Sequence, residues 1–521
     1  MKITNIFLFL LFILTQYSQL KLADETDPYV VKIKSGLIKG FDQEGTMAFL
    51  GIPYAKVERF MPPLPVDSWD DIRVCDHWGP QAMQNTNAEL GEDKMSEKNS
   101  CVLNVWTTDK NGKKPVMLWL HGGAFDFGSA AGSPGMSLAK KDVVVVSINH
   151  RLNILGFLDL STVSEKYKYS GNVGMLDIVA ALEWIKDNIE QFGGDPNNVT
   201  IFGESGGGGK VGTLLCMPPA KGLFHKAIIL SGTILVVNTK SMTEKLGKAV
   251  LKELGIDNDN IDKINEISYK DLYNAGQKAM KETLGTWGFG TPMMFGFCPT
   301  PDGEIVLNQP FMPGFSEISN DVPIMIGTTF NELQTLSYNK PMKLDDARNI
   351  LKNTFDKETD NYINAFSEAY PNYTPQDLVS IDWLFRPKTL VTADSIGNKR
   401  NADTYVYIFM WKSPVSGGSC HGGELKFVFD RVNDSKGDLP NPTEDDFKLA
   451  DIMSSSWAQF AHTGDPNIDE LPTWKPYNAD NGETMIFDYE CKVRNNPDRK
   501  LEEIIHRFCF KELEEYIKNH E

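Results

Sequence analysis

Seven short runs of β-branched and other apolar residues recur along the chain, and several are apolar at consecutive positions. A strand with one face in water alternates apolar and polar residues, whereas a strand buried on both faces is apolar throughout. The runs therefore predict a large, mainly parallel central sheet covered on both sides. They lie at residues 115–120, 142–148, 198–203, 225–232, 322–328, 404–411 and 484–490.

The segments between the runs are helical in pattern. Residues 171–192 carry apolar side chains at near-helical spacing and end at Gly193-Gly194. A strand, a helix and a further strand in this order indicate a right-handed crossover of an α/β fold. Residues 242–284 and 343–384 are polar and helical without strands, so we expect helical insertions there. No Pro/Gly/Ser linker divides the chain, which predicts a single domain over residues 24–521.

Composition and charge narrow the function classes. The chain has 521 residues, 41% of them hydrophobic, which is ample for a large core. Its formal net charge is −18. Nucleic-acid binding depends on clustered Lys and Arg that neutralise phosphates, so we expect no nucleic-acid partner.

The N-terminus has the pattern of a secretory signal peptide. Lys2 precedes an apolar run at residues 6–14, which is too short to span a bilayer. We expect cleavage near residue 23, with residues 1–23 removed. No second long apolar segment follows, so the prediction is a secreted protein without a transmembrane segment.

Export bears on the cysteines and on glycosylation. Seven cysteines are an odd number, so at least one is expected to be unpaired or to pair between molecules. Their spacing indicates no metal site. The glycosylation candidates, in N-x-S/T sequences, are Asn198, Asn372 and Asn433.

The stretch "TIFGESGGGGKVG" at residues 200–212 admits three interpretations. A Walker phosphate loop fails because Glu204 stands where its first glycine is required and Val211 follows the lysine. A dinucleotide loop fails because no acidic residue occurs between Glu204 and Glu244. The pattern Gly203-x-Ser205-x-Gly207, after an apolar strand and before a helical run, fits a nucleophile elbow.

A serine nucleophile needs a base and an oxyanion hole. The loop "HGGAF" after the run at 115–120 can bring backbone N–H groups to a substrate, and Gly206 supplies another. Of eight histidines, His421 lies on a glycine-rich loop after a strand, a favoured place for a catalytic group. The acid is expected between residues 206 and 420. Glu332 follows a buried strand, and Asp302, Glu304 and Asp321 compete with it.

These segments together resemble the type-B carboxylesterase/cholinesterase family of the α/β-hydrolase fold, and in particular its bacterial p-nitrobenzyl-esterase-like members. The similarity extends from "FLGIPYAK" through "LWLHGGAF", "FGGDPNNVTIFGESGGGGKV", "GTTFNE" and "CHGGELKFVF" to "WAQFAHTGDPN". It implies a catalytic triad of Ser205, Glu332 and His421.

The same resemblance implies an oxyanion hole of the N–H groups of Gly123, Ala124 and Gly206. Behind the triad it implies a polar network that includes Glu204 and Ser231.

The chain departs from this family at three places. Ala124 stands where a third glycine is usual, which adds a methyl group near the substrate. The first disulfide of the family would join the positions of Ala82 and Ser100, and Cys101 has a possible alternative partner in Cys75. The loop that follows Ala82 lacks the tryptophan with which cholinesterases hold choline, so choline specificity is not expected.

The prediction is a secreted serine carboxylesterase that acts on a small-molecule ester through an acyl-enzyme and needs no metal or organic cofactor. A histidine base with an ordinary pKa would make activity fall as the pH drops through about 6 to 6.5. The alternatives are a lipase that acts at lipid interfaces and a catalytically silent adhesion or storage protein of this fold.

Overall fold

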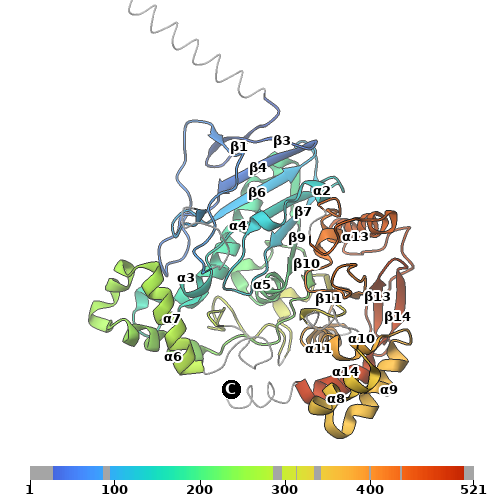
Figure 1. The fold of residues 1–521 in the computed structure, drawn as a ribbon. Helices are drawn as coiled ribbons and strands as arrows, with labels where there is room; N and C mark the ends of the chain where they lie inside the picture. Colours follow the sequence, from blue (N-terminus) through green and yellow to red (C-terminus); the bar gives the residue numbers. More distant parts are fainter. Residues whose placement is uncertain are drawn as a thin grey trace, which may run out of the picture.

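The central sheet dominates the structure (Figure 1). The computed structural model describes residues 27–85, 94–284, 296–312, 314–333, 342–397, 400–434 and 437–509, so the predicted signal peptide lies outside the described residues. Within them, eleven strands form one sheet in the order β14-β13-β12-β11-β10-β9-β7-β8-β6-β4-β3. Their bounds are β3 Phe41–Gln43, β4 Thr46–Pro53, β6 Val102–Thr107, β7 Lys114–Leu120, β8 Val144–Ile148, β9 Gly194–Glu204, β10 Lys226–Leu230, β11 Ile324–Thr329, β12 Thr404–Phe409, β13 Glu483–Phe487 and β14 Lys492–Asn495.

The middle of this sheet is parallel. From β8 to β13 every neighbouring pair of strands is parallel, while β3, β4, β6 and β14 are antiparallel to their neighbours. Each of the seven apolar runs overlaps one of the seven parallel strands. The predicted α/β fold with a large, mainly parallel sheet is therefore confirmed. A separate small sheet joins β1 (Val30–Ile33), β2 (Gly36–Lys39) and β5 (Arg73–Val74).

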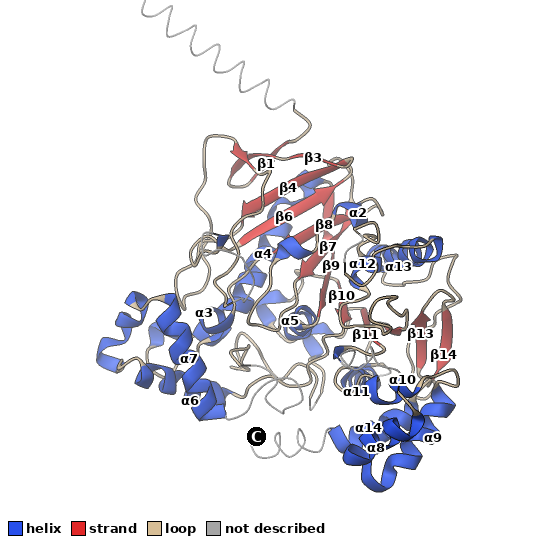
Figure 2. Cartoon of the chain, viewed as in Figure 1, coloured by secondary structure: helices blue, strands red, loops and turns tan. Residues whose placement is uncertain are grey.

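Helices cover both faces of the sheet (Figure 2). Val116, Leu118 and Leu120 of β7 pack into the core on the α4 face, and the alternate residues Met117 and Trp119 pack into the core on the α13 face. The helices that flank the sheet and its carboxyl edge are α2 Met136–Ala139, α3 Asn153–Phe157, α4 Val173–Asn188, α5 Gly206–Leu214, α11 Arg386–Ile396, α12 Leu425–Val428 and α13 Glu444–Thr463.

The expected helical insertions are present at two places. Residues 242–284 contain most of α6 (Lys240–Glu253) and all of α7 (Tyr269–Leu284), and residues 343–384 contain α8 (Leu344–Phe355), α9 (Thr359–Ala369) and α10 (Pro375–Ser380). The last helix, α14 (Arg499–Cys509), contacts α9. Figure 1 shows α6 and α7 at one side of the molecule and α8, α9 and α14 at the other. None of the helices in the described ranges is long and apolar enough to cross a membrane.

Candidate active site

The carboxyl ends of five neighbouring parallel strands bring the predicted site residues together. Leu120 pairs with Gly203, Glu204 with Leu230, and Thr329 with Phe409, so β7, β9, β10, β11 and β12 end at one edge of the sheet. The segments that follow these ends carry the oxyanion loop, Ser205, Ser231, Glu332 and His421, in that order. Catalytic groups of open α/β sheets lie at this edge.

Ser205 occupies a strained turn between β9 and α5. Its φ is 56° and its ψ is −124°, and its N–H donates to the Leu230 carbonyl at 2.9 Å. A Cβ atom on Gly207 would lie 2.0 Å from the Leu120 carbonyl oxygen, and one on Gly203 would lie 2.5 Å from the Gly207 carbonyl carbon. Only glycine at both positions lets strand and helix approach so closely, as the nucleophile elbow requires.

His421 and Glu332 form a buried, directly bonded pair. The imidazole Nδ1 hydrogen-bonds Glu332 Oε2, and Glu332 is only 1% exposed. The other carboxylate oxygen, Oε1, accepts from the Thr329 N–H at 2.7 Å. The backbone fixes the pair as well, because the His421 N–H donates to the Glu332 carbonyl at 3.1 Å. The carboxylate thus favours the proton on Nδ1, which leaves Nε2 available for proton transfer.

Nε2 of His421 faces a second carboxylate, that of Glu204. The distance from Nε2 to Glu204 Oε1 is 3.1 Å, although neither atom has a hydrogen-bond partner with good alignment in the described residues. In the described residues, Nε2 therefore makes no direct hydrogen bond to Ser205. Nε2 and the Glu204 carboxylate can lie this close when one proton resides on either of them, because Nδ1 already donates to Glu332.

The pKa values of the pair follow from this arrangement. Burial alone would lower the pKa of His421, but the Glu332 and Glu204 carboxylates outweigh it and raise the pKa to about 10. Burial raises the pKa of Glu204 to about 7, with His421 opposing the shift and Glu332 adding to it. The ordinary histidine pKa assumed from sequence is therefore wrong for this imidazole, because two buried carboxylates favour its charged form.

In the oxyanion loop, each backbone carbonyl of residues 121–124 has a hydrogen-bond partner. His121 and Ala124 oxygens each accept from Lys210 Nζ at 2.9 Å, and the Gly122 oxygen lies 2.8 Å from His121 Nδ1. The Gly123 oxygen accepts from the N–H groups of Asp126 and Phe127 at 3.2 and 3.1 Å. Because a trans peptide directs its N–H opposite to its carbonyl, the bonds of the Gly122 and Gly123 carbonyls fix the direction of the Gly123 and Ala124 N–H groups.

This loop contacts the start of α5. A Cβ atom on Gly206 would lie 2.4 Å from the Ala124 nitrogen, so the three predicted oxyanion donors are neighbours. Gly123 and Ala124 have φ values of 86° and 52°. Ala124 thus adopts a left-handed backbone conformation that favours glycine. This is a strain of the kind found at functional sites.

Ser231 lies behind the pair and contacts a residue that the sequence reasoning missed. Its Oγ donates to Glu424 Oε1 at 3.4 Å, and both side chains are fully buried. Burial, with the neighbouring charges of Glu204 and Glu332, raises the pKa of Glu424 well above its usual range. An acidic residue three positions after His421 in "HGGE" was the available signal. Glu424 is thus the third buried glutamate around this imidazole.

Phe385 was also missed. Its ring stacks on the His421 imidazole, and its N–H donates to both oxygens of the buried Asp382 at 3.1 and 2.9 Å. Burial raises the pKa of Asp382 to about 7, with Glu332 adding to the shift. No local pattern marks Phe385, because its contact with His421 is purely tertiary.

The competing acids are engaged elsewhere. Asp302 caps its own turn by accepting from the N–H groups of residues 304–306, Glu304 pairs with Lys168 at 2.8 Å, and Asp321 accepts from Asn401. Of the four candidate acids, Glu332 is the one bonded to His421.

The glycosylation candidates differ in surroundings. Asn372 and Asn433 are exposed. The amide oxygen of Asn198 accepts from Lys226 Nζ, and its amide nitrogen lies 3.5 Å from the His462 carbonyl, so a glycan at Asn198 would disrupt both contacts.

Among the cysteines that the structure describes, no disulfide replaces the missing one. Cys75 and Cys101 are both buried, free thiols, and burial raises the pKa of each, to about 12 for Cys75. The segment between Ala82 and Ser100 is therefore not closed by a pairing of these two cysteines.

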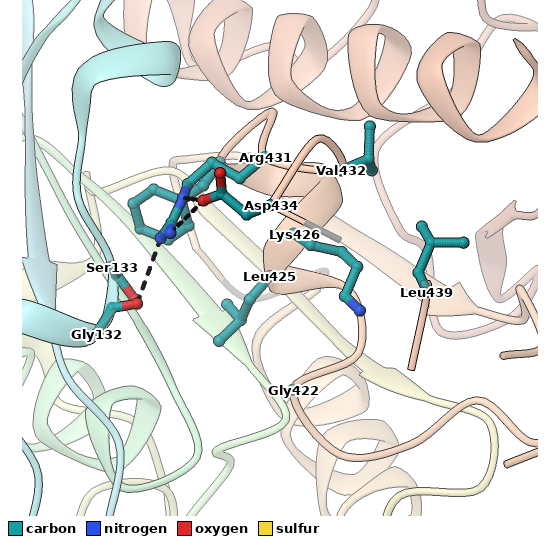
Figure 3. A pocket seen from close by; sticks show the side chains of 10 residues that line it. Gly132, Ser133, Gly422, Leu425, Lys426, Arg431, Val432, Asp434 and Leu439 are labelled. Carbon is teal, nitrogen blue, oxygen red and sulfur yellow. Dashed lines mark hydrogen bonds and ion pairs between the residues drawn. The ribbon is translucent and has the colours of Figure 1, made fainter. Parts of the chain in front are cut away.

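A cavity of about 240 Å³ adjoins the loop that carries His421 (Figure 3). Gly422 and Leu425 line it on one side, and Gly132 on the other. Arg431 joins its two walls, because it donates to the Gly132 carbonyl at 3.3 Å and to Asp434 at 2.7 Å. Ser205 and Glu332 do not line this cavity, so it lies beside the candidate site and not over it.

Comparisons with known proteins agree with this geometry. Residues 27–503 match the model of the carboxylesterase family. The chain is 33% identical to para-nitrobenzyl esterase of Bacillus subtilis over 90% of this chain and 96% of that protein, and 31% identical to liver carboxylesterase 1 of Oryctolagus cuniculus over 86% of each. A solved esterase of Clostridium hathewayi, described as able to hydrolyze aliphatic aromatic polyesters, superimposes with a TM-score of 0.82 at 34% identity, covering 93% of this chain and 99% of that chain. The chain belongs to the carboxylesterase family and is a carboxylic ester hydrolase.

Proposed function

We propose that this enzyme hydrolyses small carboxylic esters with Ser205 as nucleophile, His421 as general base and acid, and Glu332 as the group that orients the imidazole. The observation that carries the proposal is the convergence of the Ser205 elbow and the bonded His421–Glu332 pair at one edge of the sheet. The triad is recognised by such geometry and by the role of each group.

The reaction follows from the positions of these groups. Ser205 Oγ adds to the ester carbonyl carbon while Nε2 of His421 takes the hydroxyl proton, and the carbonyl π electrons move onto oxygen. The N–H groups of Gly123, Ala124 and Gly206 hold that oxyanion. Collapse expels the alcohol, which takes the proton from His421. Water then repeats both steps on the acyl-enzyme and releases the acid.

Glu204 sets the protonation state in which the cycle begins. Nε2 accepts the serine proton only when it carries none itself. At 3.1 Å, the Glu204 carboxylate stabilises a proton on Nε2 and, with Glu332, raises the pKa of His421, so it sets the pH above which Nε2 is free to accept. The enzyme thus works best in the protonation state with neutral His421.

Fluorophosphonate labelling tests the nucleophile. A fluorophosphonate should modify Ser205 stoichiometrically, as located by peptide mass spectrometry, and p-nitrophenyl butyrate hydrolysis should disappear in proportion. Ser205→Ala should abolish labelling and turnover, while Ser137→Ala on α2 should retain both. A folded wild-type protein that neither labels nor turns over any soluble short-chain ester would refute the proposal. Higher activity on emulsified long-chain esters would instead indicate the lipase alternative.

We further propose that the protein is exported and glycosylated at Asn372 and Asn433. The apolar run at residues 6–14 supports export, and the family match begins at residue 27, after the proposed signal. Expression in a eukaryotic secretory host should yield a mature N-terminus near residue 24 in the medium. Glycosidase treatment should lower its mass, and Asn372→Gln with Asn433→Gln should remove that difference. An unprocessed N-terminus on intracellular protein would contradict export.

A further inference from the structure

Lys210 is fully buried on α5, directly behind the oxyanion loop. Its exposed fraction is 0%, and its Nζ donates to the His121 and Ala124 carbonyls at 2.9 Å each. Nζ also lies 5.7 Å from the centroid of the Phe125 ring. A buried ammonium usually has a bonded carboxylate, because an unpaired charge is costly to remove from water. The hydrogen bonds of Lys210 go to backbone carbonyls instead, so the ammonium joins helix α5 to one loop.

The two carbonyls bracket the predicted oxyanion donors. His121 precedes Gly122 and Gly123, and Ala124 is itself one of the donors. Gly123 and Ala124 both have positive φ, so this backbone departs from the conformation it would adopt unaided. A clamp at both ends of the segment holds the strained conformation in place. The Gly122 and Gly123 carbonyls between the ends are held from within the loop.

The two buried histidines on which Lys210 acts electrostatically add no positive charge of their own. His121 and His150 stack with ring centroids 5.0 Å apart, and burial lowers the pKa of both, to about 3 for His121. Both rings are therefore neutral at ordinary pH. Burial lowers the pKa of Lys210 itself to about 7, and the Glu204 carboxylate opposes that shift. Both forms of Lys210 have N–H donors for the two carbonyls, since the amine has two and the ammonium three, and the ammonium form also places a positive charge behind the hole.

We propose that Lys210 is a positioning residue for ester hydrolysis, which clamps residues 121–124 in the conformation that aims the Gly123 and Ala124 N–H groups at the oxyanion. The inference rests on the proposed oxyanion hole. Donors held in advance stabilise charge that develops in the transition state more than they stabilise the neutral ester. Loss of the clamp therefore lowers kcat and leaves KM nearly unchanged.

The test compares Lys210→Met with Lys226→Met. Lys226 is also a buried lysine, 8% exposed, but it lies at the amino end of β10 and donates to Asn198, at the opposite edge of the sheet from Ser205. The measurements are kcat per active site, KM for p-nitrophenyl butyrate, and the inhibition constant of a trifluoromethyl ketone. A nucleophilic serine adds to the carbonyl of such a ketone and forms a bound oxyanion. The inhibition constant therefore reports how well the oxyanion hole holds that charge, without turnover.

Removal of one oxyanion donor costs about a hundred- to a thousandfold in rate, and Lys210 acts through the donors, so Lys210→Met should lower kcat about ten- to a hundredfold. KM should stay within about threefold. The inhibition constant of the ketone should rise in step with the loss of kcat/KM. Lys226→Met should change all three by less than about threefold. Lys210→Gln, which keeps an N–H donor without the charge, should fall between wild type and Lys210→Met.

Three results would overturn the inference. One is a Lys210→Met enzyme with kcat within about threefold of wild type. Another is a loss of kcat with no change in ketone affinity, which would place the role outside the oxyanion hole. The third is failure of both Lys210 variants to fold, which would make the residue structural. The proposed function fails separately, because it is decided by labelling and turnover of the wild-type enzyme.

Discussion

The His421 imidazole lies against the Phe385 ring with centroids 5.0 Å apart and an angle of 12° between the planes. The Phe385 ring therefore packs on the face of the imidazole, while Glu332 hydrogen-bonds Nδ1 at its edge. An aromatic face also favours the imidazolium that forms when Ser205 loses its proton.

Phe385→Leu is expected to lower kcat about two- to tenfold, because such ring pairs contribute about 0.5–1.5 kcal/mol beyond burial. Steady-state kinetics on p-nitrophenyl butyrate checks this. Phe192→Leu removes a similarly buried ring that lies just before the amino end of β9, at the opposite edge of the sheet from His421, and should leave kcat unchanged. Equal kcat values for the two variants would show that the stacking has no catalytic role.

Glu204→Gln should shift the pH dependence of kcat/KM. The Glu332 and Glu204 carboxylates raise the pKa of His421. As the solution is acidified, the wild-type activity should therefore begin to fall at a pH above 6.5. Removal of one negative charge lowers the pKa of the imidazole, so the acid limb should move to lower pH by about one unit or more.

The control for this shift is Glu183→Gln, which removes one exposed carboxylate from α4. It changes the net charge equally and should leave the limb in place. An acid limb that stays at the wild-type pH in Glu204→Gln would mean that Glu204 does not set the protonation of His421.

Gly207→Ala should destabilise the protein and reduce activity. The new Cβ would lie 2.0 Å from the Leu120 carbonyl oxygen, so β7 and α5 must separate. Overpacking of this kind costs about 1–3 kcal/mol in the free energy of unfolding. Urea unfolding measures the loss, and Gly132→Ala, where a Cβ would meet nothing within 4 Å, should be neutral. Comparable stability of the two variants would contradict the tight elbow.

Asp177→Asn should cost about 3–5 kcal/mol of stability, because it leaves the buried Arg151 guanidinium without a counter-charge. Arg151 donates to Asp177 from Nε at 2.8 Å and from Nη2 at 2.6 Å, and both side chains are at most 3% exposed. Asp187→Asn on the same helix breaks an exposed pair with Lys34 and should cost less than about 1 kcal/mol. Thermal or urea unfolding distinguishes the two. A small effect of Asp177→Asn would mean that the guanidinium is satisfied by its carbonyl contacts alone.

The parallel strands could be predicted from sequence because strands buried on both faces are apolar at consecutive positions. The edge strands could not be recognised in this way. β3 and β14 have no buried residue, and β4 is interrupted by an irregular register between Phe49 and Ile52. β3 and β14 pair with strands adjacent in sequence but lack an apolar pattern, and β4 pairs on its other side with the distant β6.

The residues of the candidate site also divide into those that a local sequence pattern marks and those that only tertiary contacts place. Ser205, Glu332 and His421 follow strand ends within short motifs, so their positions could be inferred from chain order and resemblance. Lys210 and Phe385 act through contacts with residues tens of positions away, and no local pattern specifies such contacts. The raised pKa of His421 likewise arises from the Glu332 and Glu204 carboxylates, against the opposite effect of burial, and no spacing rule measures this balance.

The alignment of strand ends at one edge of the sheet also has a consequence for the refolding of the enzyme. The oxyanion loop, the elbow, Glu332 and His421 span three hundred positions of the chain, and each is placed only when its strand has joined its neighbours. Non-local pairing of this kind forms slowly. During renaturation, helical content should therefore recover well before hydrolytic activity does. The return of activity then shows that the strands of the central sheet have all joined.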